Sequence, residues 1–307
     1  MEQIEPNPQT DNAWVQCGWG RVLFAQTYND SSALADELRN EHSGQRDLAA
    51  YVENPHVVLS HAPQELFLDP SDMLRLDLHS AEEPAPAQLF DIRRLVNQGE
   101  ARAISDLYLK RDMVPADVDY IWQHNASDEV VWLVAVDRSS GVLLGTVMGL
   151  DHVEIFGDEQ GGSSLWCLAV DPAAPVSGVG EALVRALAGL FKERGRRFMD
   201  LSVVHDNEQA KKLYDKLGFT KVRVFTLKTK NAHNQALFLG PELDEKLNPY
   251  ARIIVDEARS RGIGVEVLDG EEGYFRLHRG GKSIVCRESL TELTSAVAMS
   301  RCQDKYV

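Results

Sequence analysis

The sequence has few cysteines, no long apolar run and fewer basic than acidic residues. Its four cysteines, Cys17, Cys167, Cys286 and Cys302, form no Cys-x-x-Cys pair. They predict neither a zinc site nor a disulfide framework, and we interpret them as reduced thiols in a cytoplasmic protein. No apolar stretch approaches the roughly 20 residues that cross a bilayer. Residues 1–10 lack the basic and apolar segments of a signal peptide. The net charge of −15 argues against nucleic acid or an anionic membrane as the main partner.

The composition is that of a globular chain with room for more than one domain. The hydrophobic fraction is 44% and the charged fraction 26%, which are ordinary values for a protein with a buried core. A Pro- and Ala-rich stretch at 82–87 and a change of character near Pro241 divide the 307 residues. We expect an N-terminal α/β segment over 1–85, a central unit over 86–240 to which that segment could belong, and a C-terminal part over 241–307.

Blocks of strand-like and helix-like sequence fill the middle of the chain. The apolar run 130–136, the turn 137–141 and the run 142–150 predict a hairpin of two strands. A strand is predicted over 165–170, and apolar residues from Val179 to Phe191 then recur at helical spacing. Further expectations are strands over 21–27, 57–59, 198–204 and 221–228, helices over 89–108, 116–123 and 207–217, and a helix capped by Ser31 or Ser32. No internal repeat is apparent.

A glycine-containing loop before the long helix is the first sign of chemistry. The strand ends at Asp171-Pro172, and Gly178 and Gly180 stand where the helix begins. Glycine permits positive φ and lets a ligand approach the backbone closely. Consecutive N–H groups at the start of a helix bind anionic phosphate groups. Alone, the pattern favours an ordinary strand-to-helix turn over a phosphate site.

A second motif downstream supports a phosphate-binding role for this loop. The helix Asn207-Glu208-Gln209-Ala210 to Tyr214 ends in Leu217-Gly218-Phe219. The sequence resembles the GNAT acetyltransferase superfamily over about residues 90–240. The resemblance lies in the order of a strand, Gly-x-Gly, a helix, a second strand, Asn-x-x-Ala-x-x-x-Tyr and Leu-Gly-Phe. The resemblance implies an α+β fold with a mixed, mostly antiparallel twisted sheet flanked by helices. It also implies acetyl-CoA as cofactor and a small-molecule amine as acceptor.

The resemblance assigns cofactor contacts residue by residue. The backbone of strand 165–170 would pair with the amides of the pantetheine arm, as an added strand would. Loop N–H groups would hold the pyrophosphate, and an asparagine would contact the pantetheine arm. The positions that match these roles are Leu168 and Val170 on the strand, Ser177, Gly178, Val179 and Gly180 in the loop, and Asn207.

The catalytic acid that the resemblance implies is Tyr214. Attack of an amine on a thioester expels a thiolate, and a phenol with a pKa near 10 can donate a proton to it. The alternative is that the Tyr214 ring only packs against Leu213, Leu217 and Phe219. Direct attack by the amine is favoured over a covalent intermediate on Cys167, because a buried, inert cysteine is far more common.

Two features of the motif stay open in the sequence. The first signature position, Arg or Gln in the family, is Pro175, so a cationic contact to the phosphates is missing; Arg185, Lys211 or Lys212 could replace it, or be ordinary surface charges. The general base is also unsettled. The candidates are Glu154 and His205, ranked first, followed by Asp151, His152 and Asp200.

The C-terminal part has a resemblance of its own. Asn248-Pro249-Tyr250-Ala251, the strand 265–268 and residues 300–305 resemble the leading subdomain of ATP-grasp carboxylate–amine ligases. This implies a small α/β subdomain in which Lys305 matches a lysine that reaches ATP phosphates. ATP and Mg would be cofactors only with the complete ATP-grasp domain, so we expect no ligase activity from this chain. The alternative is an α/β appendage of the central unit.

The combination of the two resemblances suggests a function. Fusion of a GNAT domain to an ATP-grasp ligase is similar to the bacterial N-acetylglutaminylglutamine synthetase family, which makes an osmoprotectant dipeptide. The acceptor would then be the α-amine of a small amino acid or a glutamine dipeptide. The alternatives are a protein or polyamine acetyltransferase, and a non-catalytic acyl-CoA-binding domain that regulates the attached ligase.

Overall fold

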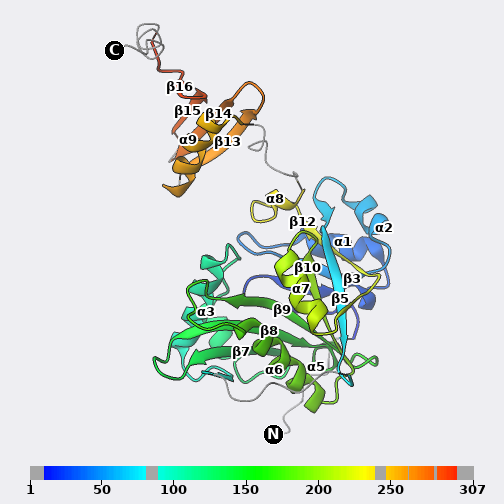
Figure 1. The fold of residues 1–307 in the computed structure, drawn as a ribbon. Coiled ribbons are helices and arrows are strands. Elements are labelled where there is room, and N and C mark those ends of the chain that lie inside the picture. Colours follow the sequence, from blue (N-terminus) through cyan, green and yellow to red (C-terminus); the bar gives the residue numbers. More distant parts are fainter. Residues whose placement is uncertain (1–9, 81–88, 239–246, 262, 280–281, 296–307) are drawn as a thin grey trace. The chain divides into compact units, whose positions relative to one another are not determined.

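The computed structural model describes residues 10–80, 89–238 and 247–295, apart from 262 and 280–281. The chain forms two compact units, Met1–Asn234 and Gln235–Val307, and each is described by itself (Figure 1). The stretch 82–87 and Pro241, which the sequence suggests as boundaries, lie outside the described residues.

A seven-stranded sheet, which we call the large sheet, forms the centre of the first unit. Its strand order is β11-β5-β10-β9-β8-β7-β6. Neighbouring strands are antiparallel except β9 and β10, which are parallel. The predicted hairpin is confirmed as β7 and β8. The strands are β5 (Ser71–Asp77), β6 (Phe90–Arg93), β7 (Val130–Asp137), β8 (Leu143–Asp151), β9 (Gly162–Val170), β10 (Phe198–Val204) and β11 (Thr220–Lys221).

Helices cover both faces of the large sheet. On one face, α6 buries Leu183, Leu187 and Phe191 in a core that it shares with α7. On the other face, α3 and α4 bury Tyr108 and Ile121. Each fully buried side chain of this size contributes about 1.5–3 kcal/mol, so apolar burial fixes both layers. The helices are α3 (Gln98–Lys110), α4 (Val118–Gln123), α5 (His152–Phe156), α6 (Val179–Glu193) and α7 (Glu208–Lys216).

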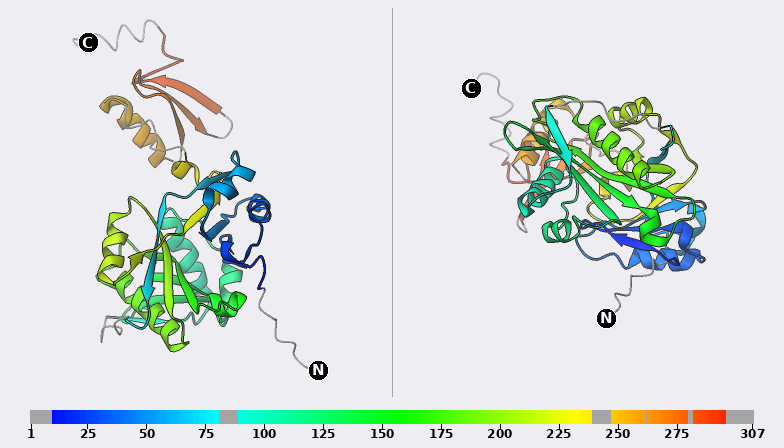
Figure 2. Two further views of the ribbon diagram at one scale, coloured as in Figure 1. Left: turned by 90° about the vertical axis from the view of Figure 1, so that its right-hand side faces the viewer. Right: turned by 90° about the horizontal axis from the view of Figure 1, so that it is seen from below.

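A second, five-stranded sheet, the small sheet, is built mainly from the N-terminal residues. Its order is β1-β2-β3-β12-β4. One face packs on α1 and α2 through Leu34, Val58 and Leu227. The other joins the core that holds α3 and α4, so the blue N-terminal elements lie against the green central sheet in Figure 2. The elements are β1 (Trp14–Gln16), β2 (Arg21–Phe24), η1 (Ala25–Thr27), α1 (Ser31–Arg39), β3 (Leu48–Val52), α2 (Pro55–His61), β4 (Leu66–Leu68) and β12 (Phe225–Thr229).

The two sheets share one strand pattern. From β1, the small sheet has an antiparallel, a parallel and two antiparallel pairings. From β8, the large sheet has the same series through β9, β10, β5 and β11. In each, a helix joins the parallel strands and a second helix follows. The structure therefore contains a repeated half that the sequence did not reveal.

The last strand of each half lies in the sheet of the other half. Strand β5 follows β4 of the small sheet but pairs with β10 and β11 of the large sheet. Strand β12 follows β11 of the large sheet but pairs with β3 and β4 of the small sheet. Because each sheet needs a strand from the other, the two halves are interlocked within one unit.

The second unit is a helix with a four-stranded antiparallel sheet. The sheet has the order β13-β14-β15-β16, and α9 packs on it through Ala251 and Val255 against Phe275. Asn248 caps α9, as its position before Pro249 predicts. Lys305 and residues 300–304 lie outside the described residues. The elements are α8 (Gln235–Phe238), α9 (Pro249–Ser260), β13 (Gly264–Asp269), β14 (Tyr274–Arg279), β15 (Lys282–Arg287) and β16 (Leu290–Thr291).

Several local predictions are wrong. The single strand predicted over 221–228 is instead two strands, β11 and β12, in different sheets. The strand predicted over 57–59 is part of α2, which begins at Pro55 because proline suits the first turn of a helix. The helix predicted from 89 begins at Gln98, and residues 90–93 form the edge strand β6. Helix α1 is capped by Asp30 rather than by Ser31 or Ser32.

Candidate functional site

The two parallel strands of the large sheet separate along their length. Strands β9 and β10 pair only from Gly162–Phe198 to Leu165–Leu201. Beyond that point β9 continues to Val170 and β10 to Val204 without further pairing between them over this described part of the chain. We call this opening the split. The facing edges of separated strands carry N–H and C=O groups that can pair with an extended ligand.

A bulge in β9 lies where the split begins. The register with β8 shifts between Thr146 and Met148, so Cys167 and Leu168 stand opposite the single residue Val147. Cys167 has a φ of 49°, a conformation that costs a non-glycine residue free energy. Bulges re-aim backbone groups next to functional sites. The bulge turns the β9 backbone at the point where it loses its partner.

The glycine loop forms the N-terminus of α6 at the same end of β9. Gly178 is the N-cap with a φ of 82°, and no side chain caps the helix. In the described chain, no acceptor binds the backbone N–H groups of Gly178, Val179, Gly180 or Glu181. A Cβ on Gly178 would meet no atom within 4 Å, so the positive φ, and not crowding, explains this glycine. Free N–H groups facing open space fit an anionic phosphate.

The basic residues suggested as substitutes for the missing signature cation differ in their surroundings. Arg185 bonds Glu181 with its Nη2 at 3.1 Å. Lys211 Nζ lies 3.5 Å from Glu208 and donates to the carbonyl of His205. Lys212 is exposed, and no acidic partner for it is found among the described residues. The phosphate site at the start of α6 would therefore consist mainly of backbone N–H groups. Of the three basic residues, Lys212 is the one without an acidic partner among the described residues.

The remaining predicted cofactor residues line the split. Leu168 and Val170 are half-buried at the margin of the core under α6. Asn207 caps α7, and its Oδ1 accepts a hydrogen bond from the N–H of Ala210 at 3.1 Å. The carboxamide oxygen of Asn207 is thus used structurally, which leaves its Nδ2 group for a ligand.

Tyr214 lies on α7 beside the split. Its ring packs on Phe219 with centroids 5.5 Å apart. The ring therefore makes the packing contact that the sequence suggested as the alternative to a catalytic role. Burial raises the pKa of Tyr214 to about 12, which keeps the phenol protonated at neutral pH. No hydrogen bond joins its hydroxyl to another described residue. The proton remains available to a ligand.

The two residues ranked first as general base lie at opposite ends of the sheet. Glu154 is on α5, beside the paired start of β9, where Arg196 Nη2 donates to it at 2.6 Å. His205 follows β10 at the open end of the split. Its Nδ1 lies 3.0 Å from the carbonyl oxygen of Pro70, which leaves Nε2 as the free ring nitrogen. The structure brings His205, and not Glu154, to the end where Asn207 and Tyr214 lie.

The other candidates for the base are held in structural pairs. Asp151 binds Arg194 and Arg196. Asp200 forms two 2.8 Å hydrogen bonds with Arg75 across β5 and β10; burial raises the pKa of Asp200, against the effect of Arg75. Burial lowers the pKa of His152 to about 3, so this ring stays neutral at physiological pH.

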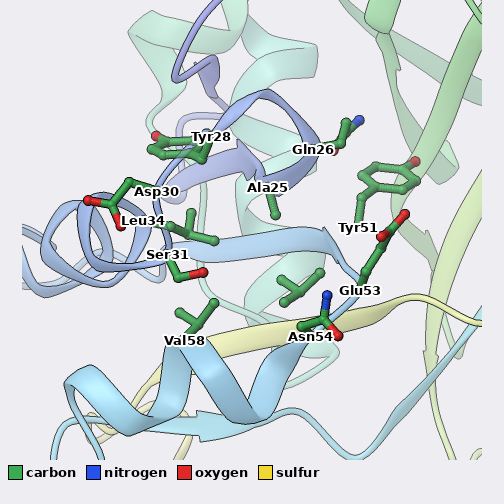
Figure 3. A pocket seen from close by; sticks show the side chains of 11 residues that line it. Ala25, Gln26, Tyr28, Asp30, Ser31, Leu34, Tyr51, Glu53, Asn54 and Val58 are labelled. Carbon is green, nitrogen blue, oxygen red and sulfur yellow. The ribbon is translucent and has the colours of Figure 1, made fainter.

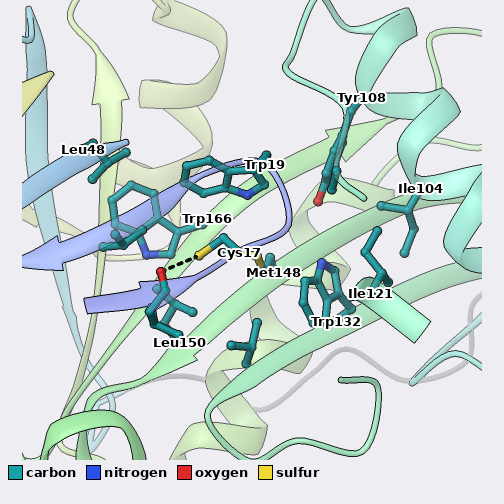
Figure 4. Packing of buried hydrophobic residues seen from close by; sticks show 14 of the residues in the cluster. Cys17, Trp19, Leu48, Ile104, Tyr108, Ile121, Trp132, Met148, Leu150 and Trp166 are labelled. Atoms are coloured by element: carbon teal, nitrogen blue, oxygen red, sulfur yellow. Dashed lines mark hydrogen bonds between the residues drawn. The ribbon is translucent and has the colours of Figure 1, made fainter. Parts of the chain in front are cut away.

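The Cys167 thiol has the properties of a packed, inert side chain. Burial raises the pKa of Cys167 to about 12, so the reactive thiolate is absent at neutral pH. Around it, Trp166 packs beside Trp19 with ring centroids 6.5 Å apart, and the Cys17 thiol donates to a backbone carbonyl (Figure 4). A covalent route through Cys167 is disfavoured.

A cavity of about 280 Å³ occupies the equivalent position in the small sheet. It is lined by residues after β2, at the start of α1 and after β3, including Gln26, Ser31 and Glu53 (Figure 3). Here the helix start is closed: Asp30 Oδ1 accepts from the N–H of Ser32 at 3.0 Å. With Asp30 and Glu53 in its lining and no basic residue there, this cavity disfavours a phosphate.

The sequence did not indicate a buried ion pair that lies near the split. Lys228 Nζ lies 2.8 Å from Asp69 Oδ2, and both side chains are buried. The two residues are far apart in the sequence and belong to no motif. They meet only because the last strand of each half crosses into the other sheet, a feature that no local pattern reveals.

The middle of the chain matches a known family. Residues 99–219 match the model of the acetyltransferase (GNAT) family. The chain carries a GNAT acetyltransferase domain. The match and the mixed, helix-flanked sheet confirm the predicted α+β GNAT fold. Strand β5 lies before the matched segment, so the GNAT domain completes its sheet with a strand from the preceding half.

Solved structures similar to this chain include several acetyltransferases. A Drosophila protein has a TM-score of 0.48 and 16% identity, covering 69% of this chain and 71% of its own. A GCN5-related N-acetyltransferase from Sphaerobacter thermophilus has 0.44 and 19%, covering 61% and 59%. A tandem GNAT protein of the clavulanic acid pathway has 0.46 and 14%, covering 69% of each chain. No curated protein matches significantly.

Two further kinds of site were sought in the part of the chain that the structure describes. No group of three or more His, Cys, Asp or Glu side chains in those residues is arranged to hold a metal ion. No helix formed by them has the length and apolar character needed to span a membrane.

Proposed function

We propose that this protein transfers an acetyl group from acetyl-CoA to the amine of a small molecule by direct attack. The observation that carries the proposal is the coincidence, at one end of β9, of three features. These are the split, the uncapped N-terminus of α6 and the protonated Tyr214. Acetyl-CoA supplies an activated acyl thioester to this site.

Each residue around the split has a role that its environment permits. The N–H groups from Ser177 to Gly180 hold the pyrophosphate, and the free edge of β9 at Leu168 and Val170 binds the pantetheine arm. Asn207 Nδ2 contacts the same arm. Tyr214 donates its proton toward the sulfur, which a phenol with a raised pKa can do at neutral pH.

We assign the role of base to His205 rather than to Glu154. His205 Nε2 is free at the open end of the split, whereas Glu154 is paired with Arg196 beside α5. The exposed position of His205 also lets an ordered water relay the proton.

The acceptor that fits the resemblance is the α-amine of an amino acid or a glutamine dipeptide. Its support is the resemblance of residues 248–307 to the leading subdomain of ATP-grasp carboxylate–amine ligases. ATP and Mg have no proposed site among the described residues. Pro175 favours a second candidate, a regulatory domain that binds acyl-CoA without turnover, because the usual cationic contact is absent.

Measurement of CoA release separates these candidates. Acetyl-CoA is offered with a panel of amines that includes glutamine, glutaminylglutamine and polyamines. Turnover with a small amine supports the proposal, and binding of acetyl-CoA without turnover across the panel supports the regulatory candidate.

The substitution Tyr214→Phe tests the acid directly. It should lower kcat about 10- to 100-fold, since general acids contribute at least this much, while the Kd of acetyl-CoA stays unchanged. The matched control is Tyr28→Phe in the small sheet, whose hydroxyl is buried and has no hydrogen-bond partner in the described chain; it should leave kcat as it is. Equal turnover of Tyr214→Phe and wild type would remove Tyr214 as the acid.

A further inference from the structure

The buried pair Asp69–Lys228 lies beside the open end of the split. Asp69 is in the link that carries the chain from β4 in the small sheet to β5 in the large sheet. The next residue, Pro70, accepts a 2.9 Å hydrogen bond from the N–H of His205. Ser71 then stands opposite Val204, the last residue of β10. Asp69 is therefore next to the end of the separated strand.

Lys228 points toward the large sheet. It stands opposite Leu48 on β3, and Leu48 belongs to the same core as Trp166 of β9 (Figure 4). Thr226, two residues earlier on the same face, donates to Met73 Sδ at 3.5 Å. Met73 stands opposite Ser202 on β10, beyond the last pairing with β9. The ammonium group thus faces the region where the strands have separated.

The carboxylate of Asp69 is incompletely satisfied. Its Oδ2 lies 2.8 Å from Lys228 Nζ, but the contact is not aligned as a hydrogen bond, and Oδ1 has no donor among the described residues. Asp69 is 3% exposed. A buried acceptor without a donor costs about 1–3 kcal/mol, so this oxygen is poised for a ligand that carries an N–H group.

A second cation lies within electrostatic range of Lys228. Arg46 is half-buried, and its buried Nε has no hydrogen-bond partner in the described chain. Burial lowers the pKa of Lys228 to about 8, and the charge of Arg46 acts in the same direction. Two cations thus accompany one carboxylate. The excess positive charge in a partly dry site favours an anionic group on the ligand.

We propose that Asp69, Lys228 and Arg46 form the acceptor subsite, and that the acceptor is a free α-amino acid. The α-ammonium donates to Asp69 Oδ1, and the α-carboxylate binds Lys228 and Arg46. An α-amino acid carries both charges on one carbon, which suits the adjacent, opposite charges of Asp69 and Lys228. The inference rests on the proposed acetyltransferase function, because it assigns the acceptor of that reaction.

Binding measurements test the subsite without turnover. The full chain, with and without saturating CoA, is titrated calorimetrically with the common L-α-amino acids and with their α-amides, which lack the carboxylate. At least one amino acid should bind about tenfold or more tightly than its amide, since a buried charge pair controls affinity on this scale. If no amino acid binds more tightly than its amide, the subsite is wrong.

Variants locate the effect. Arg46→Gln and Lys228→Met should each weaken binding of the amino acid about tenfold and leave the affinity for the amide unchanged. The control Lys230→Met removes a half-buried lysine just past the same strand, whose Nζ donates to the carbonyl of Pro63, and should have no effect. Arg46→Gln carries the test if Lys228→Met fails to fold, because Arg46 is only half-buried. Unchanged binding by Arg46→Gln would overturn the assignment.

A parallel titration with acetyl-CoA separates two kinds of failure. If acetyl-CoA binds but no amino acid is preferred over its amide, the acceptor subsite is wrong and the proposed transferase stands. If acetyl-CoA does not bind, the proposed function fails first.

Discussion

The two halves of the first unit have the same strand pattern but opposite helix starts. Between the parallel strands of the large sheet, α6 begins at Gly178 with no side-chain cap. Between those of the small sheet, α1 follows its N-cap Asp30, whose carboxylate accepts a hydrogen bond from the backbone N–H of Ser32. An N-terminal carboxylate and a phosphate compete for the same N–H groups and the same helix dipole.

The two halves have the same arrangement of strands and helices but different residues at the start of the helix between their parallel strands. The pattern of strands gives each half a recess where parallel strands end. In the function that we propose, the half with glycine at the helix start and with Tyr214 beside it supplies the groups for acyl-CoA chemistry. On this proposal the local residues, and not the strand pattern alone, determine where the cofactor binds.

The largest effect that we expect concerns the junction between the halves. His152 is packed between Phe24 and Tyr51 of the N-terminal half and Phe156, and its Nε2 lies 2.9 Å from Ser164 Oγ. Burial, then Arg75, lowers the pKa of His152 to about 3, despite Asp158 at 3.9 Å. The unfolded chain binds this proton near pH 6.5 and the folded chain only near pH 3.

The free energy of unfolding should therefore fall as the pH is lowered from 6.5 toward 3. The loss attributable to His152 is about 5 kcal/mol, at about 1.4 kcal/mol for each of the roughly 3.5 pKa units. Urea unfolding of wild type and of His152→Gln, which keeps a polar group near Ser164, measures it. The variant should lose less stability across this range, and an identical pH dependence in both proteins would show that His152 does not control the junction.

The strand exchange predicts that the halves unfold together. Leu227 on β12 is fully buried in the core of the small sheet, so Leu227→Ala should destabilise the first unit by about 3 kcal/mol. Leu68 stands opposite it on β4 but is 42% exposed, and Leu68→Ala should cost less than about 1 kcal/mol. Hydrogen exchange should show the loss in both sheets. Faster exchange in the small sheet alone would show that the two halves unfold independently.

The smallest effect concerns the closed helix start. Asp30→Ala removes the cap of α1 and should cost about 1 kcal/mol, seen as a lower Tm. The control Asp36→Ala removes an exposed carboxylate of the same helix that pairs with Arg39 and should change Tm little. A cost no larger than that of the control would show that Asp30 does not satisfy the helix start.

The sequence predicted those elements of the fold that have strong local sequence patterns. The strand over 198–204, the hairpin of β7 and β8, the long helix after Pro175 and the cap at Asn248 were all confirmed, because apolar period and capping residues act locally. The strand predicted over 57–59 failed because Val57, Val58 and Leu59 resemble a buried strand, whereas Pro55 starts a helix.

The site was predictable only where it rests on contiguous motifs. Gly178, Asn207 and Tyr214 were selected because contiguous motifs around them resemble those of the GNAT superfamily, and in the structure they lie near the split. The strand exchange was not predictable, since β5 and β12 pair with partners more than a hundred residues away in the sequence. The pair of Asp69 and Lys228 depends on that exchange.

Titration of acetyl-CoA into three proteins tests the central claim most directly. The wild type should bind one molecule per chain. Gly178→Asp gives the large sheet the cap of the small sheet and should weaken binding about 100-fold, whereas Gly178→Asn, which tolerates positive φ without a charge, should weaken it less than about tenfold. Two acetyl-CoA molecules per chain, or equal binding by the Asp and Asn variants, would contradict the account.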